Sequence, residues 1–210
     1  MISSTDLPKI TDHMGQLFSM AVGSKINLEA ITYSIERSDF AAELQASRCG
    51  QLVNSTAEEL FESLFGRADS GLSRLSYDGT YDDAYWCGWA YTQLLFETRL
   101  PLPYLFLVLP LERMLDLYPV YHEMDITQLI DLLETERREE TLMKRLLKRH
   151  GVKVPALSLQ SGVSPNTINH YKKSDENLYA AGFQNVFRLA QALDVPPELF
   201  LQRLPLEIEK

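Results

Sequence analysis

The residues that most constrain this chain are Gly162, Ser164 and Pro165, within the run SLQSGVSPNTINHYKK that spans residues 158–173. A glycine permits the left-handed backbone of a tight turn, and Gly162 follows a segment that can place Leu157 in a core. Ser164 is a preferred helix N-cap, and Pro165 suits the first helical position. The sequence therefore predicts a helix, a glycine turn and a second, capped helix, which is the helix-turn-helix arrangement.

Helical spacing predicts the two sides of this second helix. Ile168 and Tyr171 lie three residues apart, so we expect both to face inward. The polar residues then point outward or flank the core: Asn166, Thr167, Asn169, His170, Lys172 and Lys173. An α-helix fits the major groove of DNA, where an asparagine can pair with adenine and lysines can neutralise phosphates.

The flanking segments also predict helices. Residues 142–151, LMKRLLKRHG, give an amphipathic helix that Gly151 can end, and Pro155 fits the start of the next. Asp194 and the two prolines after it predict the start of a last short helix, with Leu199 and Phe200 buried. In the helix before it, we expect one apolar stripe of Phe183, Val186, Phe187, Ala190 and Leu193.

Charge is distributed unevenly along the 210 residues, whose formal net charge is -9. Residues 1–140 hold 10 Lys and Arg against 23 Asp and Glu, whereas residues 141–210 hold 10 against 6. DNA would repel the acidic part and attract the basic part. The charged run ETERREET between them is rich in helix formers, which predicts a helical connector. We therefore expect an acidic helical domain at residues 1–136 and a basic domain at residues 137–210.

Helix signals dominate the first domain too, so the predicted class is all-α. Ser55 with Glu58 forms a capping-box pattern. Residues 28–48 predict one long amphipathic helix, and its expected core positions are Ile31, Ile35, Phe40 and Leu44. No segment shows the clean alternation typical of strands, although a minor hairpin around Asp78-Gly79 stays open.

Aromatic residues cluster in the middle of the chain, where Asp82 or Asp83 can cap a helix that extends to Thr98. Aromatic residues at helical spacing are typical of a core, but they also anchor protein interfaces. Cys87, within this helix, is expected to be a buried small apolar residue. The cluster comprises Tyr77, Tyr81, Tyr85, Trp86, Trp89 and Tyr91.

On the runs SLQSGVSPNTINHYKK and VFRLAQALDVPPELF, the region from Met143 to Leu201 resembles the Cro/cI repressor family of helix-turn-helix proteins. This resemblance implies a lambda-repressor-like domain of five short helices, the second and third forming the motif. It implies a sequence-specific transcriptional regulator that binds double-stranded DNA with its third helix in the major groove. The stretch between the third and fourth helices, SDENLYAAG at residues 174–182, is longer than the shortest form of this connection in the family.

The same resemblance implies roles for individual residues. Ser164 would sit at a phosphate, while Asn166 and His170, with Pro165 beside them, would meet base edges. Lys153 stands where the family usually has a phosphate-binding Ser-Gln pair, so that clamp is either missing or replaced by Lys153. The residues expected to support or touch the DNA backbone are Thr167, Asn169, Lys172 and Lys173.

The first two-thirds resembles an uncharacterised family of small bacterial regulators whose genes lie near toxin–antitoxin-like pairs. That resemblance rests on the runs DFAAEL, DDAYWCGWAYTQLLFET and LERMLDLYPVYHEMD. It implies the architecture of nearly the full chain, in which a helical leader precedes a C-terminal Cro/cI-like domain. Because one such domain contacts few bases, we expect residues 1–136 to serve dimerisation or partner binding, in a homodimer or in a complex with a protein partner. The alternative function is an antitoxin-like or adaptor protein whose acidic part masks a toxin-like protein partner.

Other functional classes find no support in the sequence. His122 with Glu123 is half of a zinc-protease motif, but Ile126 stands where the second histidine is required. No phosphate-binding glycine loop or nucleophile elbow occurs, so we expect no enzyme, no catalytic or metal-binding residues and no cofactor. The N-terminus lacks a signal-peptide pattern, and the apolar run at residues 100–111 is too short to span a bilayer. We therefore expect a cytoplasmic protein with no membrane partner.

Overall fold

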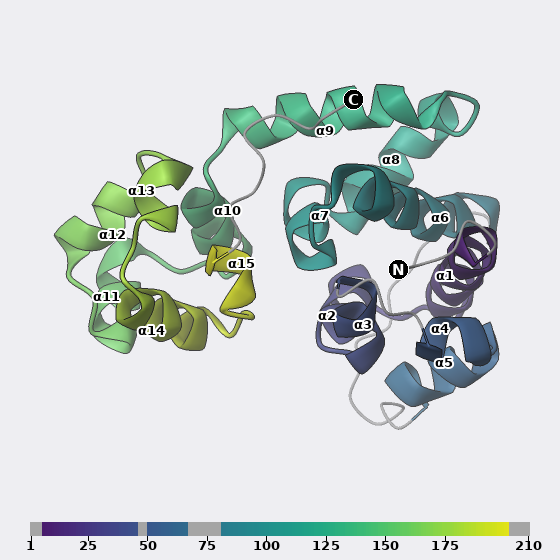
Figure 1. Cartoon of the computed structure of the whole chain (residues 1–210), viewed down its shortest axis with the longest axis horizontal. Helices are drawn as coiled ribbons and strands as arrows, with labels where there is room; N and C mark the ends of the chain where they lie inside the picture. Colours follow the sequence, from purple (N-terminus) through teal and green to yellow (C-terminus); the bar gives the residue numbers. More distant parts are fainter. Residues whose placement is uncertain (1–5, 46–49, 67–80, 202–210) are drawn as a thin grey trace. The chain divides into compact units, whose positions relative to one another are not determined.

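The computed structural model describes residues 6–45, 50–66 and 81–201, and its elements there are all α-helices, α1 to α15 (Figure 1). This confirms the predicted all-α class. The candidate hairpin around residues 78 and 79 lies outside the described residues. The chain forms two compact units, Met1–Asp131 and Leu132–Lys210. In the described part, no helix combines the length and apolar character needed to cross a membrane.

The first unit is organised around α1, which packs along α6. The two backbones approach so closely at Gly88 that a Cβ there would lie 2.3 Å from the Met14 carbonyl oxygen. Beside this crossing, the rings of Phe18, Tyr91 and Phe106 pack with centroid separations of 4.7 to 6.4 Å. The helices are α1 (Leu7–Gly23), α2 (Leu28–Glu36), α3 (Asp39–Gln45), α4 (Gly50–Asn54), α5 (Ala57–Phe65), α6 (Tyr81–Thr98), α7 (Leu102–Val108) and α8 (Leu111–Tyr121).

The single helix predicted for residues 28–48 is wrong, because the chain breaks between α2 and α3. Ser38 lies at the break, where its hydroxyl donates to the Ile35 carbonyl at 2.7 Å and accepts from the Ala41 amide at 3.2 Å. A serine side chain that bonds backbone groups in this way competes with the helical ladder. Ile31, Ile35 and Leu44 are buried as expected, and the side chain of Phe40, the fourth expected core position, lies outside the described part.

Two predicted caps in the first unit are also wrong. The capping box of α5 uses Thr56 and Glu59, one residue after the predicted pair Ser55 and Glu58. Asp82 and Asp83 lie in the first turn of α6 and do not precede it. There the Asp83 carboxylate accepts from the Ala84 amide at 2.7 Å.

The aromatic residues of α6 belong mainly to the core, as the helical spacing indicates. Trp86 and Tyr91 are buried, whereas Tyr85 and Trp89 are partly exposed. Tyr77 lies outside the described residues. Cys87 is fully buried, and this burial raises the pKa of its thiol well above the ordinary value. The thiol is therefore a packed apolar group.

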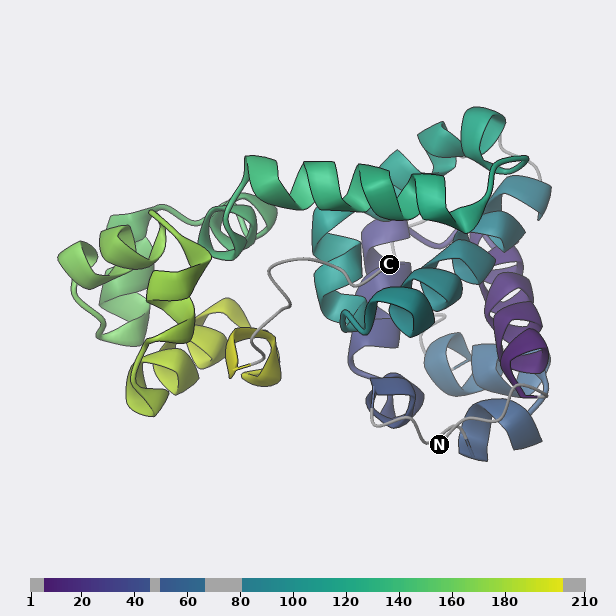
Figure 2. The ribbon, with the colours of Figure 1, turned by 45° about the horizontal axis from the view of Figure 1, so that its top comes forward.

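The second unit contains a compact group of short helices that follows the helix crossing the division between the units. Figure 2 shows that helix, α9, as one continuous ribbon, which agrees with the predicted helical connector as far as Glu139. The helices are α9 (Ile126–Glu139), α10 (Leu142–Arg149), α11 (Val154–Ser161), α12 (Pro165–Tyr171), α13 (Asp175–Tyr179), α14 (Phe183–Leu193) and α15 (Glu198–Leu201).

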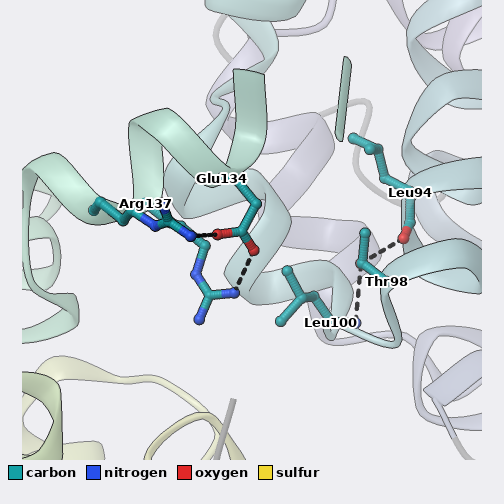
Figure 3. A network of polar contacts seen from close by, with 6 residues as sticks. Leu94, Thr98, Leu100, Glu134 and Arg137 are labelled. Atoms are coloured by element: carbon teal, nitrogen blue, oxygen red, sulfur yellow. Dashed lines mark hydrogen bonds and ion pairs between the residues drawn. The ribbon is translucent and has the colours of Figure 1, made fainter. Parts of the chain in front are cut away.

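Two sets of side-chain contacts close the last turn of α6 and stabilise α9 (Figure 3). Thr98 donates to the Leu94 carbonyl at 2.5 Å and accepts from the Leu100 amide at 3.2 Å, so it closes the last turn of α6. Within α9, the Glu134 carboxylate pairs with Arg137 at 2.9 Å and with Arg138 at 3.3 Å. These pairs, three and four residues apart, stabilise the charged part of the helix.

The apolar stripe predicted on α14 is partly wrong. Val186, Ala190 and Leu193 are buried as expected, but Phe183 is 66% exposed and Phe187 is 51% exposed. Leu189, which the predicted stripe omits, takes their place in the core. The buried face of α14 is therefore rotated away from both phenylalanines.

Candidate nucleic-acid interface

The turn between α11 and α12 is built from three adjacent residues. Gly162 adopts a left-handed conformation, with φ +69° and ψ 10°. Ser161 closes the turn, because its hydroxyl donates to the Leu157 carbonyl at 2.6 Å and accepts from the Val163 amide at 3.2 Å. Val163 and Leu157 are both buried beneath it. The turn thus holds the start of α12 against α11.

The start of α12 agrees with the capping prediction. The Ser164 hydroxyl accepts from the Thr167 amide at 3.1 Å and lies 2.8 Å from the Thr167 hydroxyl. Pro165 occupies the first helical position, as predicted. Ser164 and Thr167 therefore stabilise the start of α12 through their mutual hydrogen bonds. Both hydroxyls also lie at the surface.

The inward face of α12 is anchored by Ile168 and Tyr171, both buried as predicted. The Tyr171 hydroxyl accepts from the Asn185 side chain at 3.1 Å, which ties α12 to α14. Asn177 in α13 donates to the His170 carbonyl at 3.1 Å and satisfies the carboxyl end of α12. The helix is therefore positioned by contacts on one side and at its end, which leaves its other side exposed.

The outward side of α12 carries the predicted polar set. Asn166, Asn169 and His170 are spaced by three and four residues, so they follow one face of the helix, and Lys173 lies in the turn just after it. All four are exposed. Among the remaining candidates, Ser164, Pro165 and Lys153 are exposed, and Thr167 and Lys172 are partly buried.

Lys153 stands on a different element from the other candidates. It precedes the first residue of α11, and its side chain is exposed.

The charge around this face is positive. Residues 141–174 contain no Asp or Glu, and the next carboxylates along the chain are Asp175 and Glu176. The Asp175 carboxylate accepts from the Leu142 amide at 2.8 Å, at the start of α10. Burial raises the pKa of Asp175, while the Leu142 amide and Arg137 oppose that shift. The carboxylate is thus directed into the unit.

A second bond joins the same two parts of the unit. The Thr141 hydroxyl donates to the Lys172 carbonyl at 3.2 Å, just after α12 ends. Arg145 holds the preceding corner, because its guanidinium donates to the Glu136 and Glu140 carbonyls. Sequence reasoning missed Thr141, Asp175 and Asn185 as positioning residues. Their partners lie 14 to 33 residues away, so no local pattern marks them.

Comparisons of this chain with protein-family models, curated proteins and solved structures returned no match. The resemblance of residues 143–201 to the Cro/cI family therefore stays a prediction from the sequence. Within the described part of the chain, no three His, Cys, Asp or Glu side chains gather in a way that could hold a metal ion.

Proposed function

We propose that this protein is a DNA-binding transcriptional regulator that lays α12 in the major groove. In this proposal, α10, α11, α12, α14 and α15 correspond to the five helices of a lambda-repressor-like domain. The short helix α13 is then an addition formed from the long stretch at residues 174–182. The acidic first unit does not contact DNA and serves assembly instead.

The observation that carries the proposal is the outward face of α12. It combines amide, imidazole and ammonium groups, and no carboxylate lies on α11 or α12 to repel phosphate. Asn166 and His170 are exposed near the amino-terminal and carboxyl-terminal ends of the helix, so both can reach base edges. Lys172 and Lys173 follow α12 and supply phosphate contacts.

A single such helix reads few base pairs, so the proposal includes a homodimer. Two recognition helices held about 34 Å apart match successive major grooves on one side of the duplex. Simultaneous binding of two half-sites raises affinity without any new type of contact. Sedimentation of the full chain should therefore give the mass of two copies.

The proposal is tested by selecting duplexes from a random library at low ionic strength and measuring affinity for those recovered. Replacing Lys172 and Lys173 by Ala should weaken binding to all duplexes and lower the salt slope by about one for each lysine. Asn166→Ala should relax the preference at one base pair, at a cost of about 1–3 kcal/mol for the preferred base.

A matched control lies in the same unit. Lys144 and Lys148 are exposed on α10, so replacing both by Ala removes the same charge from another helix. We expect this control to retain base preference and most of the affinity. Equal losses from both lysine pairs would indicate attraction without docking, and no selected duplex at all would refute the proposal.

A second function, partner binding by the first unit, is favoured by the end of α8. Val120 is 56% exposed and Met124 is 39% exposed, with the acidic Glu123 beside Met124. An antitoxin-like or adaptor protein would cover such side chains with a partner protein. Val120→Ser with Met124→Ser should then abolish homodimerisation or partner capture while DNA binding by the monomer is retained.

A further inference from the structure

Phe183 and Phe187 form an exposed aromatic pair on α14. They lie four residues apart, and their rings stack with centroids 6.2 Å apart and planes 25° apart. The opposite face of α14 is already buried against α11 and α15. This helix thus exposes apolar side chains that the core of its own unit does not use.

The pair stands out from the other exposed apolar side chains of the described residues. Tyr33 is covered by the Arg37 guanidinium, 4.4 Å from its ring centroid. Phe183 and Phe187 instead meet each other and together expose on the order of 200 Å² of apolar surface. The exposed large apolar residues are Tyr33, Val120, Met124, Leu159, Phe183 and Phe187.

The charged side chain of α14 beside the pair is a cation. Arg188 is exposed next to Phe187, and α14 contains no carboxylate, although the exposed Asp194 follows its last residue. Gln184 and Gln191 are also exposed on this helix and supply neutral hydrogen-bonding groups. An apolar centre with a cationic and polar edge is complementary to an apolar side chain flanked by carboxylates.

We propose that the face formed by Phe183, Gln184, Phe187, Arg188 and Gln191, the α14 face, binds an acidic amphipathic helix of a partner protein. Apolar side chains of that helix lie against the two rings, and a carboxylate pairs with Arg188. The site requires neither DNA binding nor the Lys172 and Lys173 contacts.

Two other occupants fit the α14 face less well. A second copy placed symmetrically would bring a second Arg188 and no carboxylate of α14 to this surface, so the charges of the two faces would not be complementary. Duplex DNA stacks its bases inside the helix, so it offers the rings no apolar surface outside the grooves. An acidic helix satisfies both the rings and the charge.

The test uses the full-length protein and a fluorescent synthetic helix with leucines four residues apart and glutamates on its remaining face. Anisotropy should give saturable binding that weakens with salt, and a peptide with lysines in place of glutamates should bind at least tenfold more weakly. Phe183→Ser with Phe187→Ser, and separately Arg188→Glu, should each weaken binding of the acidic peptide at least tenfold.

Two controls separate this site from the proposed DNA interface. Lys172→Ala with Lys173→Ala should leave peptide binding unchanged, which excludes an acidic peptide that merely imitates DNA. The double phenylalanine variant should keep its circular dichroism and its affinity for DNA. Because Phe183 is 66% exposed and Phe187 is 51% exposed, neither ring is part of the buried core, and their replacement should leave the fold in place.

Several results would overturn the inference. They are a Kd for the acidic peptide weaker than about 1 mM, equal binding of the two peptides, or retention of binding by the α14 variants. Loss of self-association on replacing the phenylalanines would assign the α14 face to a second copy. A parallel loss of DNA affinity would assign it to the DNA interface. Failure of all DNA binding, with peptide binding intact, would refute only the proposed function.

Discussion

Gly88 at the crossing of α1 and α6 and Gly162 in the turn before α12 are both required, but for different physical reasons. A Cβ at Gly88 would lie 2.3 Å from the Met14 carbonyl oxygen, so that position lacks space. A Cβ at Gly162 would meet no atom within 4 Å, but the backbone there has φ +69°. The first constraint comes from tertiary packing and the second from local backbone geometry.

This difference determines what a sequence can reveal. Gly162 is followed by a capping serine and a proline, so its turn could be predicted from neighbouring residues. No residue near Gly88 in the sequence indicates that the backbone of Met14, 74 positions earlier, lies against it in the fold. The two glycines therefore allow the two kinds of constraint to be measured in one chain.

The largest effect should follow Gly88→Ala. Helix propensity alone would favour alanine by about 1 kcal/mol, but the new methyl group must displace the backbone of α1. Overpacking of this kind typically costs 1–3 kcal/mol, and we expect about 3 kcal/mol because backbone yields less than a side chain. Both tryptophans of the chain lie in α6, so urea unfolding followed by their fluorescence reports the first unit.

Gly50→Ala is the control for this measurement. Gly50 lies in α4, and a Cβ there would meet nothing within 4 Å. Its replacement should leave the stability unchanged or raise it by up to about 1 kcal/mol. A loss as large as that of Gly88→Ala would show that the crossing is not the cause.

Gly162→Ala should have the next largest effect, about 1–2 kcal/mol for a left-handed residue that carries a Cβ. Gly162→Asn should lose less, because asparagine adopts this conformation more readily. The loss should appear in the far-ultraviolet circular dichroism of the second unit and leave the tryptophan transition in place. Equal losses for alanine and asparagine would contradict a purely conformational origin.

Ser164→Ala should destabilise the second unit by about 1 kcal/mol, because the Thr167 amide loses its acceptor. Ser164→Thr keeps a hydroxyl at the N-cap and should retain most of the stability. Chemical denaturation followed by circular dichroism measures both. If alanine and threonine behave alike, the hydrogen bond between Ser164 and the Thr167 amide contributes nothing to the stability of the helix.

The sequence predictions succeeded where the constraint is local and failed where it comes from tertiary packing. Residues 158–173 were predicted nearly residue by residue, since turn, cap and first helical position are encoded by adjacent residues. The stripe on α14 was partly wrong, because Phe183 and Phe187 together with the buried residues give apolar character to more than half of its circumference. Periodicity then cannot identify which part meets α11. The hydrogen bonds of Thr141 and Asp175 could not be predicted either, because their partners are distant in the sequence.

The smallest expected effects are changes of folding stability with pH, which should occur in different pH ranges for the two units. Burial, with the Asp12 carboxylate as hydrogen-bond acceptor, raises the pKa of Tyr85 in the first unit to about 12. A raised pKa means that the folded state keeps the proton longer, so this contribution to stability is complete below about pH 10. It is lost as the pH rises toward 12. Tyr85→Phe should flatten that alkaline decline in the tryptophan-monitored stability.

In the second unit, Asp175 should make the stability depend on pH in the acid range instead. Burial raises the pKa of its carboxyl despite the opposing Leu142 amide, Arg137 and Arg145, and Glu176 adds to the rise. The stability that protonation contributes is therefore complete below about pH 3.9 and is lost as the pH rises through the folded-state value. Asp175→Asn, which can still accept from the Leu142 amide, should lack this slope, so the slope should appear in the wild-type-minus-variant profile measured by circular dichroism. A slope of opposite sign would mean that the amide and the two arginines outweigh burial, and that the carboxylate is held at this corner as a favourable charge.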